Sequence, residues 1–186
     1  MVIVYSEAVK SEFEGTIVDI ETIEDFCRGY GDSREYQKLI PLIFGYINSS
    51  ELTIYCSKIG GSGKIEPTRN FKSAVVETIP KLEKPLCAFQ CCFEQGVLYH
   101  SLGIIVEFDR ELNIEKYEWK GNAVASLSID NYDDPFNDIG KRCKEELEKG
   151  NTELAIKHNR SCLLKERDIL LKRGFREPDE LQLFRV

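Results

Sequence analysis

The sequence predicts an α/β fold in which a mixed central sheet is flanked by helices. Apolar and β-branched runs over residues 15–20, 39–47 and 51–56 indicate three strands early in the chain. Helical spacing of apolar residues then alternates with a further short apolar run, and repeated strand-to-helix order is typical of α/β sheets. The remainder, over 138–149 and 151–173, has helical spacing.

Length and composition limit the fold and the compartment. The chain has 186 residues, 42% hydrophobic and 31% charged, which suits one core, so we expect a single domain over 1–186. No run reaches the roughly 18 apolar residues that a membrane-spanning helix needs, and charge follows the N-terminus too early for a signal peptide. Seven cysteines without a CxxC pair indicate reduced thiols. We therefore expect a cytoplasmic protein with no membrane contact.

The predicted elements follow in order. Residues 15–20 form a strand after a glycine, and the next two strands flank turn residues 48–50. Helical spacing of apolar residues predicts a helix over 68–83, which Pro85 follows.

A short strand over 86–89 comes next, followed by a helix over 92–102. Extended structure is expected over 104–108 and 112–119, ahead of the two helices that end the chain. The glycine-rich stretch at 60–64 departs from a phosphate-binding loop, because Lys58 and Ile65 stand where that loop has glycine and Ser/Thr. We interpret it as an ordinary loop.

Two carboxylates stand at the end of the first predicted strand. Asp19 and Glu21 are two residues apart, so strand alternation points both to one face. Adjacent hard oxygen ligands suit Mg²⁺ or Mn²⁺. A solvated strand edge is the alternative interpretation.

Two helices carry further candidates. Glu94 follows Gln90 by four positions, where the second predicted helix begins; an acid is also favoured there by the helix dipole alone. On the last helix, His158, Cys162 and Glu166 are four residues apart and form one stripe, which could face a site or be structural.

Taken together, these segments resemble the DEDD superfamily of 3'→5' exonucleases, which have a ribonuclease H-like fold. Asp19 and Glu21, followed by Thr22, match the first motif of that superfamily. Residues 88–98 resemble the second motif and residues 158–162 the third, in its Y/H-N-x-x-D form. Residues 131–138 and the last helix are similar to a group of archaeal exonucleases.

Two residues depart from the family pattern. Glu94 stands in an aspartate position and keeps the charge. Cys162 stands where the last aspartate is usual, and a thiol serves Mg²⁺ poorly. Glu166, one turn further on the same stripe, could supply the missing carboxylate, whereas Asp168 lies on another side of the helix. If Glu166 does not supply this carboxylate, the site works with three acids and His158, or the activity is weak.

The resemblance implies two-metal hydrolysis with Mg²⁺ or Mn²⁺ as the cofactor. In that mechanism Asp19, Glu21 and Glu94 hold metal, Glu166 is the candidate fourth ligand, and His158 acts as the general base. The expected substrate is single-stranded DNA rather than RNA, although nothing in the sequence reads a 2'-hydroxyl.

The net charge of −7 argues against binding nucleic acid by charge alone. Seven basic and two acidic residues nevertheless lie between 157 and 176, and we expect this helix to contact phosphates. The residues expected to contact nucleic acid are Thr22, Gln90, Asn159, Arg160 and Lys165. Phe26, Tyr30 and Tyr36 are candidates for base stacking or for packing.

Two other functions stay open at this point. A catalytically weak or inactive ribonuclease H-like module that binds nucleic acid or a protein partner would account for Cys162 and the negative charge. An endonuclease or a nucleotide phosphohydrolase would use the same acidic centre. Because no accessory domain is evident, we also expect a homo-oligomer.

Overall fold

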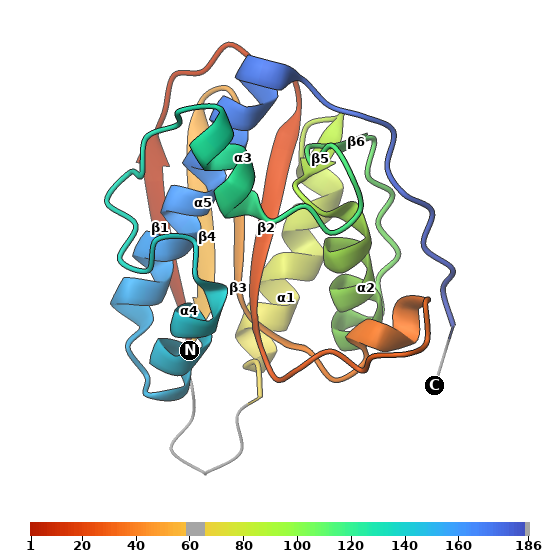
Figure 1. Cartoon of the computed structure of the whole chain (residues 1–186). Coiled ribbons are helices and arrows are strands. Elements are labelled where there is room, and N and C mark those ends of the chain that lie inside the picture. Colours follow the sequence, from red (N-terminus) through yellow and green to blue (C-terminus); the bar gives the residue numbers. More distant parts are fainter. Residues whose placement is uncertain (59–65, 185–186) are drawn as a thin grey trace.

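A six-stranded mixed sheet runs through the protein (Figure 1). The computed structural model describes residues 1–58 and 66–184, so the glycine-rich stretch at 60–64 lies outside the described residues. The sheet has the order β1-β4-β3-β2-β5-β6. Its strands are β1 (Val2–Ala8), β2 (Thr16–Ile23), β3 (Ile40–Ile47), β4 (Glu51–Ser57), β5 (Leu86–Ala88) and β6 (Arg110–Glu111).

The first four strands pair antiparallel, whereas β5 pairs parallel to β2, and β6 parallel to β5. A tight turn joins β3 to β4, because Asn48 Oδ1 accepts hydrogen bonds from the backbone N–H groups of Ser50 and Glu51, both at 2.9 Å. The turn that the sequence predicted at residues 48–50 is therefore confirmed.

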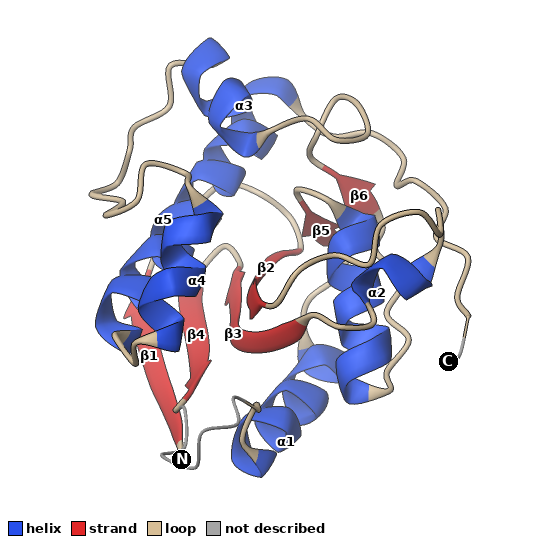
Figure 2. Cartoon of the chain, turned by 60° about the horizontal axis from the view of Figure 1, so that its bottom comes forward, coloured by secondary structure: helices blue, strands red, loops and turns tan. Residues whose placement is uncertain are grey.

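Helices cover both faces of the sheet (Figure 2). On one face lie α1 (Arg69–Thr78) and α2 (Cys91–Leu102), and on the other α4 (Gly140–Glu148) and α5 (Thr152–Arg173). The short helix α3 (Lys120–Ser126) packs against α5. Two 3₁₀ turns, Ser33–Tyr36 and Ile79–Lys81, complete the helical structure of the described residues.

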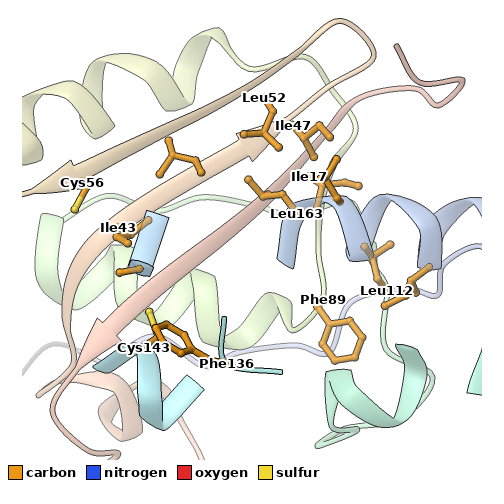
Figure 3. Packing of buried hydrophobic residues seen from close by; sticks show 14 of the residues in the cluster. Ile17, Ile43, Ile47, Leu52, Cys56, Phe89, Leu112, Phe136, Cys143 and Leu163 are labelled. Atoms are coloured by element: carbon orange, nitrogen blue, oxygen red, sulfur yellow. The ribbon is translucent and has the colours of Figure 1, made fainter. Parts of the chain in front are cut away.

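The alternation of β2 divides the core between these faces. Ile17 and Ile23 pack into the cluster that includes Leu163 of α5 (Figure 3), whereas Val18 and Ile20 pack with α1 and α2. The result is an α/β structure compatible with three layers, as the sequence predicted. No helix in the described part of the chain is both long and apolar enough to span a bilayer.

Two elements escaped the sequence analysis. The edge strand β1 pairs with β4 about fifty residues away, and such non-local pairing is not visible in a local pattern. Helix α3, which was not predicted, begins directly after residue 119. The segments 104–108 and 112–119 were predicted to be extended, but the strand in this part of the chain is β6, which has two residues and lies between them at 110–111. The remaining strands and the helices α1, α2, α4 and α5 confirm the predictions to within a few residues.

Close packing between β3 and α5 depends on a glycine. A Cβ built on Gly45 would lie 2.1 Å from Asn159 Oδ1 and 2.9 Å from Leu163 Cδ1, so any side chain there would push α5 away from the sheet. We expect Gly45→Ala to lower the free energy of unfolding by about 1–3 kcal/mol, measured by denaturant titration.

The matched control is Gly140→Ala at the start of α4, where a Cβ meets no atom within 4 Å. Its free energy of unfolding should stay equal to that of the wild type or rise slightly. Equal destabilisation by both substitutions would contradict the packing argument.

Candidate metal centre

A pocket of about 380 Å³ opens at the end of β2, between the two helical layers. Strand β2 supplies Asp19 and Glu21, and helix α2 supplies Glu94. Further polar lining comes from Gln90, Glu118, Lys120, Asp138, His158 and Cys162.

The two acids of β2 lie on one face of the strand, as predicted. Asp19 is opposite Gly45 of β3 and Glu21 is opposite Ile43, so the register alternates regularly between them. An irregularity between Glu21 and Thr22 then shifts the register, and Thr22 lines a neighbouring pocket instead. Strand alternation therefore brings the two carboxylates together.

An ammonium group joins two of the acids. Lys120 Nζ of α3 lies 2.8 Å from Asp19 Oδ1 and 2.5 Å from Glu166 Oε1. Asn159 donates a hydrogen bond to Asp19 Oδ2 at 2.7 Å. Burial raises the pKa of Asp19, but Lys120 outweighs it and holds that pKa below its usual value. The side chain of Asp19 is therefore held in its ionised, carboxylate form.

Glu94 and Glu166 are buried without full compensation. In the described part of the chain, neither Glu94 Oε2 nor Glu166 Oε2 accepts a hydrogen bond. Burial, reinforced by the negative charge of Asp19, raises the pKa of both groups well above the usual value. Such unpartnered carboxylate oxygens are costly, and they fit a site that binds a cation.

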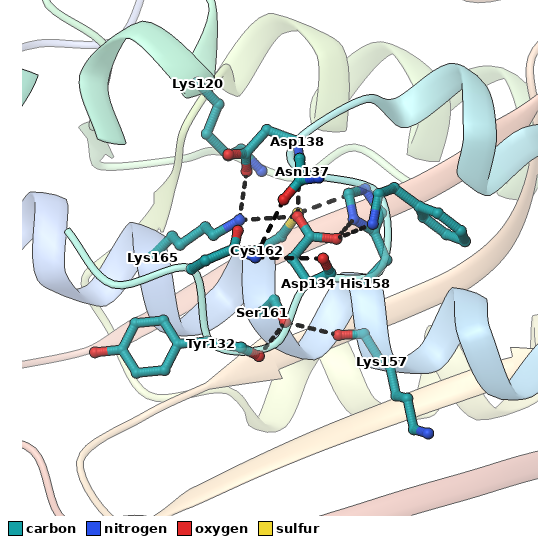
Figure 4. Close-up of polar contacts among 12 residues, drawn as sticks. Lys120, Tyr132, Asp134, Asn137, Asp138, Lys157, His158, Ser161, Cys162 and Lys165 are labelled. Carbon is teal, nitrogen blue, oxygen red and sulfur yellow. Dashed lines mark hydrogen bonds and ion pairs between the residues drawn. The ribbon is translucent and has the colours of Figure 1, made fainter. Parts of the chain in front are cut away.

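A second group of side chains surrounds His158 (Figure 4). His158 Nδ1 lies 2.7 Å from Asp134 Oδ1, and Nε2 lies 3.6 Å from Glu21 Oε1 and 3.7 Å from Cys162 Sγ. The predicted stripe of α5 is confirmed, because His158 and Cys162 line the same pocket and Glu166 pairs with Lys120, which also lines it.

Asp168, ranked lower from the sequence, lies elsewhere. Its carboxylate pairs with Arg167 and accepts a hydrogen bond from Tyr132, and it does not line the pocket.

Two residues predicted to contact nucleic acid lie inside the protein. Lys165 is fully buried, and its Nζ lies 2.8 Å from both Asp134 Oδ2 and Asp138 Oδ1. Asn159 is also fully buried, where it holds Asp19. The two residues lie about 120° apart around α5: Asn159 lies against β2 and β3, whereas Lys165 faces the 131–138 segment, and both of these sides of the helix are covered. Their observed role is to fix acidic side chains.

The predicted phosphate-binding surface of α5 is largely neutralised. Arg160 pairs with Glu7 of β1 at 2.8 Å, and every other basic residue between 157 and 176 has an acidic or carbonyl partner. These partners are Glu153 for Lys157, Asp134 for Lys165, Asp168 for Arg167, the Leu127 carbonyl for Lys172, Glu118 for Arg173 and Asp179 for Arg176. The charge count of the segment was correct, but it does not give a free basic face.

The other predicted contacts lie around the pocket. Gln90 precedes α2, is half-buried and lines the pocket. Phe26 is 49% exposed and also lines it, whereas Tyr36 is buried with its ring edge on Phe26. Tyr30 is exposed and lies under the Arg34 guanidinium. Of the three aromatic candidates, only Phe26 is placed to contact a ligand in the pocket.

Three functional candidates, Asp134, Asp138 and Lys120, were not predicted from the sequence. The NYDDPFND segment was noted without a role, yet its Asp134 holds His158 and its Asp138 lines the pocket. Lys120 had no signal, because nothing in the local pattern places a lysine of a short helix beside Asp19.

Comparison with protein-family models, curated proteins and solved structures finds no match for this chain. The chemistry of the pocket is therefore argued from its own side chains.

The charge of Glu21 should make stability depend on pH. Burial and the nearby Asp19 raise the pKa of Glu21 to about 7, whereas the unfolded value is 4.5. The folded protein thus holds a proton that the unfolded chain releases, and stability falls as pH rises from 4.5 to 7. At pH 8 we expect Glu21→Gln to unfold at a temperature a few degrees above that of the wild type, a gain on the order of 1–3 kcal/mol.

This gain should disappear below about pH 4.5, where the wild-type carboxyl is protonated in both states. Glu107→Gln, at an exposed position, serves as the control and should show no pH-dependent gain. Thermal melts across this pH range measure both variants. A Glu21→Gln protein less stable than the wild type at pH 8 would contradict the analysis.

Proposed function

We propose that the protein is a metal-dependent 3'→5' exonuclease that hydrolyses phosphodiester bonds of single-stranded DNA. The observation that carries the proposal is the convergence of Asp19 and Glu21 of β2 and Glu94 of α2 on one pocket, with Glu166 of α5 buried behind it and paired with Lys120 of the pocket lining. Burial of four acids is costly, and a fold that maintains it has a functional reason to do so.

The donor set fits Mg²⁺ or Mn²⁺. Both ions prefer carboxylate oxygens. Within the described residues, one oxygen of Glu94 and both oxygens of Glu166 accept no hydrogen bond, although Glu166 Oε1 forms an ion pair with Lys120. Asp19, Glu21, Glu94 and Glu166 would hold the metal. When bound, divalent ions supply an activated water and stabilise the charge of the leaving group. They would also neutralise a pocket that otherwise repels phosphate.

The general-base role expected for His158 is not part of this proposal. Burial lowers the pKa of His158, but Cys162, Glu21 and the hydrogen bond to Asp134 outweigh burial and raise it to about 12. A raised pKa favours the doubly protonated imidazole, which is a poor general base. His158 instead positions Glu21.

Aromatic side chains at the pocket support single-stranded DNA as the substrate. Phe26 and Trp119 line the pocket and are 49% and 55% exposed. Such rings can stack on unpaired bases regardless of sequence. Because the basic residues of α5 are already paired, stacking and metal contacts would carry more of the binding than free positive charge does. The preference for DNA over RNA and the homo-oligomer both stay predictions.

The sheet also supports a ribonuclease H-like assignment. Apart from β1, the chain runs through three antiparallel strands, a helix, a strand parallel to the first of them, a second helix and a short strand. This is the order that the family resemblance implies. It brings the first and second motifs to one end of β2, where α5 adds the third.

The proposal predicts stepwise shortening of a 5'-labelled single-stranded DNA oligonucleotide when Mg²⁺ or Mn²⁺ is present. Asp19→Asn should lower the rate by more than about 100-fold, because outer-shell substitutions at metal sites alone cost about 10–100-fold. Asp168→Asn is the matched control, since Asp168 lies outside the pocket, and should retain the wild-type rate. Gel electrophoresis of a time course measures both.

A chelator should abolish the ladder of products. An intact oligonucleotide with both metals, tested alongside RNA, would contradict the proposal. Internal cleavage would favour an endonuclease.

One observation favours a second function, a binding module with little or no catalysis. The Lys120 ammonium already pairs with Asp19 and Glu166 and so stands where a metal ion could lie. With Cys162 in place of the family aspartate, this internal cation would let the acidic centre persist without metal.

Removing the internal cation tests this second function. Lys120→Met should lower the free energy of unfolding by about 3–5 kcal/mol without metal, because it leaves buried carboxylates unpaired. Mg²⁺ or Mn²⁺ should then stabilise the variant more than the wild type. Lys149→Met breaks an exposed pair with Glu146 and should cost less than about 1 kcal/mol. Equal metal effects on Lys120→Met and wild type would mean that Lys120 does not occupy a cation position.

A further inference from the structure

Three different ligand atoms face one another beside the carboxylate centre. Glu21, His158 and Cys162 each offer one ligand atom, and these three atoms lie within 4.8 Å of one another. Tetrahedral bonds of about 2.0–2.3 Å separate neighbouring ligand atoms by roughly 3.3–3.6 Å. The observed 3.6 Å from His158 Nε2 to Glu21 Oε1 and 3.7 Å from Nε2 to Cys162 Sγ are close to this spacing. Only small side-chain shifts would close the set around an ion.

The orientation of His158 is fixed from behind, as is usual for a histidine that binds metal. Asp134 Oδ1 lies 2.7 Å from His158 Nδ1 (Figure 4). The other ring nitrogen, Nε2, is therefore the one that lies near Glu21 and Cys162. Asp134 is itself immobilised: Oδ1 also accepts from the N–H of Phe136, and Oδ2 accepts from Lys165 and from the N–H of Asp138. The Asp134 carboxylate therefore orients the His158 imidazole so that its Nε2 atom can bind an ion.

The Lys120 ammonium group does not block the site formed by Glu21, His158 and Cys162. Lys120 makes its ion pairs with Asp19 and Glu166, and no ion pair in the described part of the chain joins it to Glu21, His158 or Cys162. All three of these residues line the pocket, so one side of the group is open. Three protein ligands with an open fourth position is the arrangement of catalytic rather than structural zinc sites.

We propose that Glu21, His158 and Cys162 bind a borderline-soft divalent cation of the Zn²⁺ class. Sulfur and imidazole ligands select such ions over Mg²⁺, which prefers oxygen alone. On binding, the Cys162 thiol loses its proton to solvent as the sulfur–metal bond forms, and His158 binds through Nε2 as the neutral imidazole, its other proton also released to solvent. The inference goes beyond the proposed function, because it holds whether or not the protein cleaves DNA.

Cobalt(II) is the spectroscopic probe for this site. Titration of the metal-free, reduced protein with Co²⁺ should give one equivalent of binding, a sulfur-to-cobalt charge-transfer band in the near ultraviolet, and visible bands of tetrahedral intensity. Zn²⁺ should displace the Co²⁺ and remove these bands, whereas Mg²⁺ in large excess should not.

Cysteine variants assign the sulfur. Cys162→Ala should lose the charge-transfer band and weaken Zn²⁺ binding by more than the about 10–100-fold typical of outer-shell substitutions. Cys56→Ala is the matched control, because Cys56 is equally buried but lies in β4 outside the pocket, and it should keep the wild-type spectrum. Cys162→Ser provides a closer replacement in shape, should Cys162→Ala not fold as judged by circular dichroism.

The substitution Cys162→Asp changes the donor from sulfur to oxygen at the same place. It should lose the cobalt charge-transfer band and bind Mn²⁺ at least about 10-fold more tightly than the wild type does, measured by titration calorimetry. Absence of the band in wild type, or its persistence in Cys162→Ala, would overturn the inference. The DNA assay is independent: cleavage with Mg²⁺ but no cobalt band rejects only this site, and a band without cleavage rejects only the exonuclease.

Discussion

Compensation of buried charge at the end of β2 is the constraint on which the rest of the structure depends. Asp19 and Glu21 project from a strand that is buried on both faces, so each charge needs a partner brought by another element. Helix α3 contributes Lys120, and α5 contributes Asn159 and His158. These contacts connect two helices to the centre of the sheet.

Helix α5 connects this polar centre to the apolar core. One side of the helix packs Leu163 against the sheet, which requires Gly45 on β3, while the neighbouring stripe presents His158 and Cys162 to the pocket. Outward basic residues are used in pairs such as Arg160 with Glu7, which fastens α5 to the edge strand β1. Packing, charge compensation and the candidate ligands are therefore properties of one helix, and a shift of that helix would change all three.

The features that were predicted correctly from the sequence are those that depend on local periodicity. Alternation placed Asp19 and Glu21 on one face, and helical spacing identified the stripe that contains Cys162. Tertiary pairing was beyond it: β1 is a strand because β4 lies beside it, and Lys120 is a site residue because α3 folds back onto β2. For the same reason a lysine counted as surface charge, Lys165, lies buried between two aspartates. Charge counts describe a segment, but only the fold says which charges are free.

Cys162 illustrates how a departure from a motif can carry information. In the sequence it is a missing aspartate, and the simplest interpretation is loss of a magnesium ligand. In the structure the thiol lies next to an imidazole that Asp134 has oriented toward it, and Glu21 completes a group of mixed donors. A decayed site would have no reason to keep that second layer of buried, fully satisfied partners. The arrangement is better explained by a mixed-donor site beside the carboxylate centre than by the loss of a magnesium ligand.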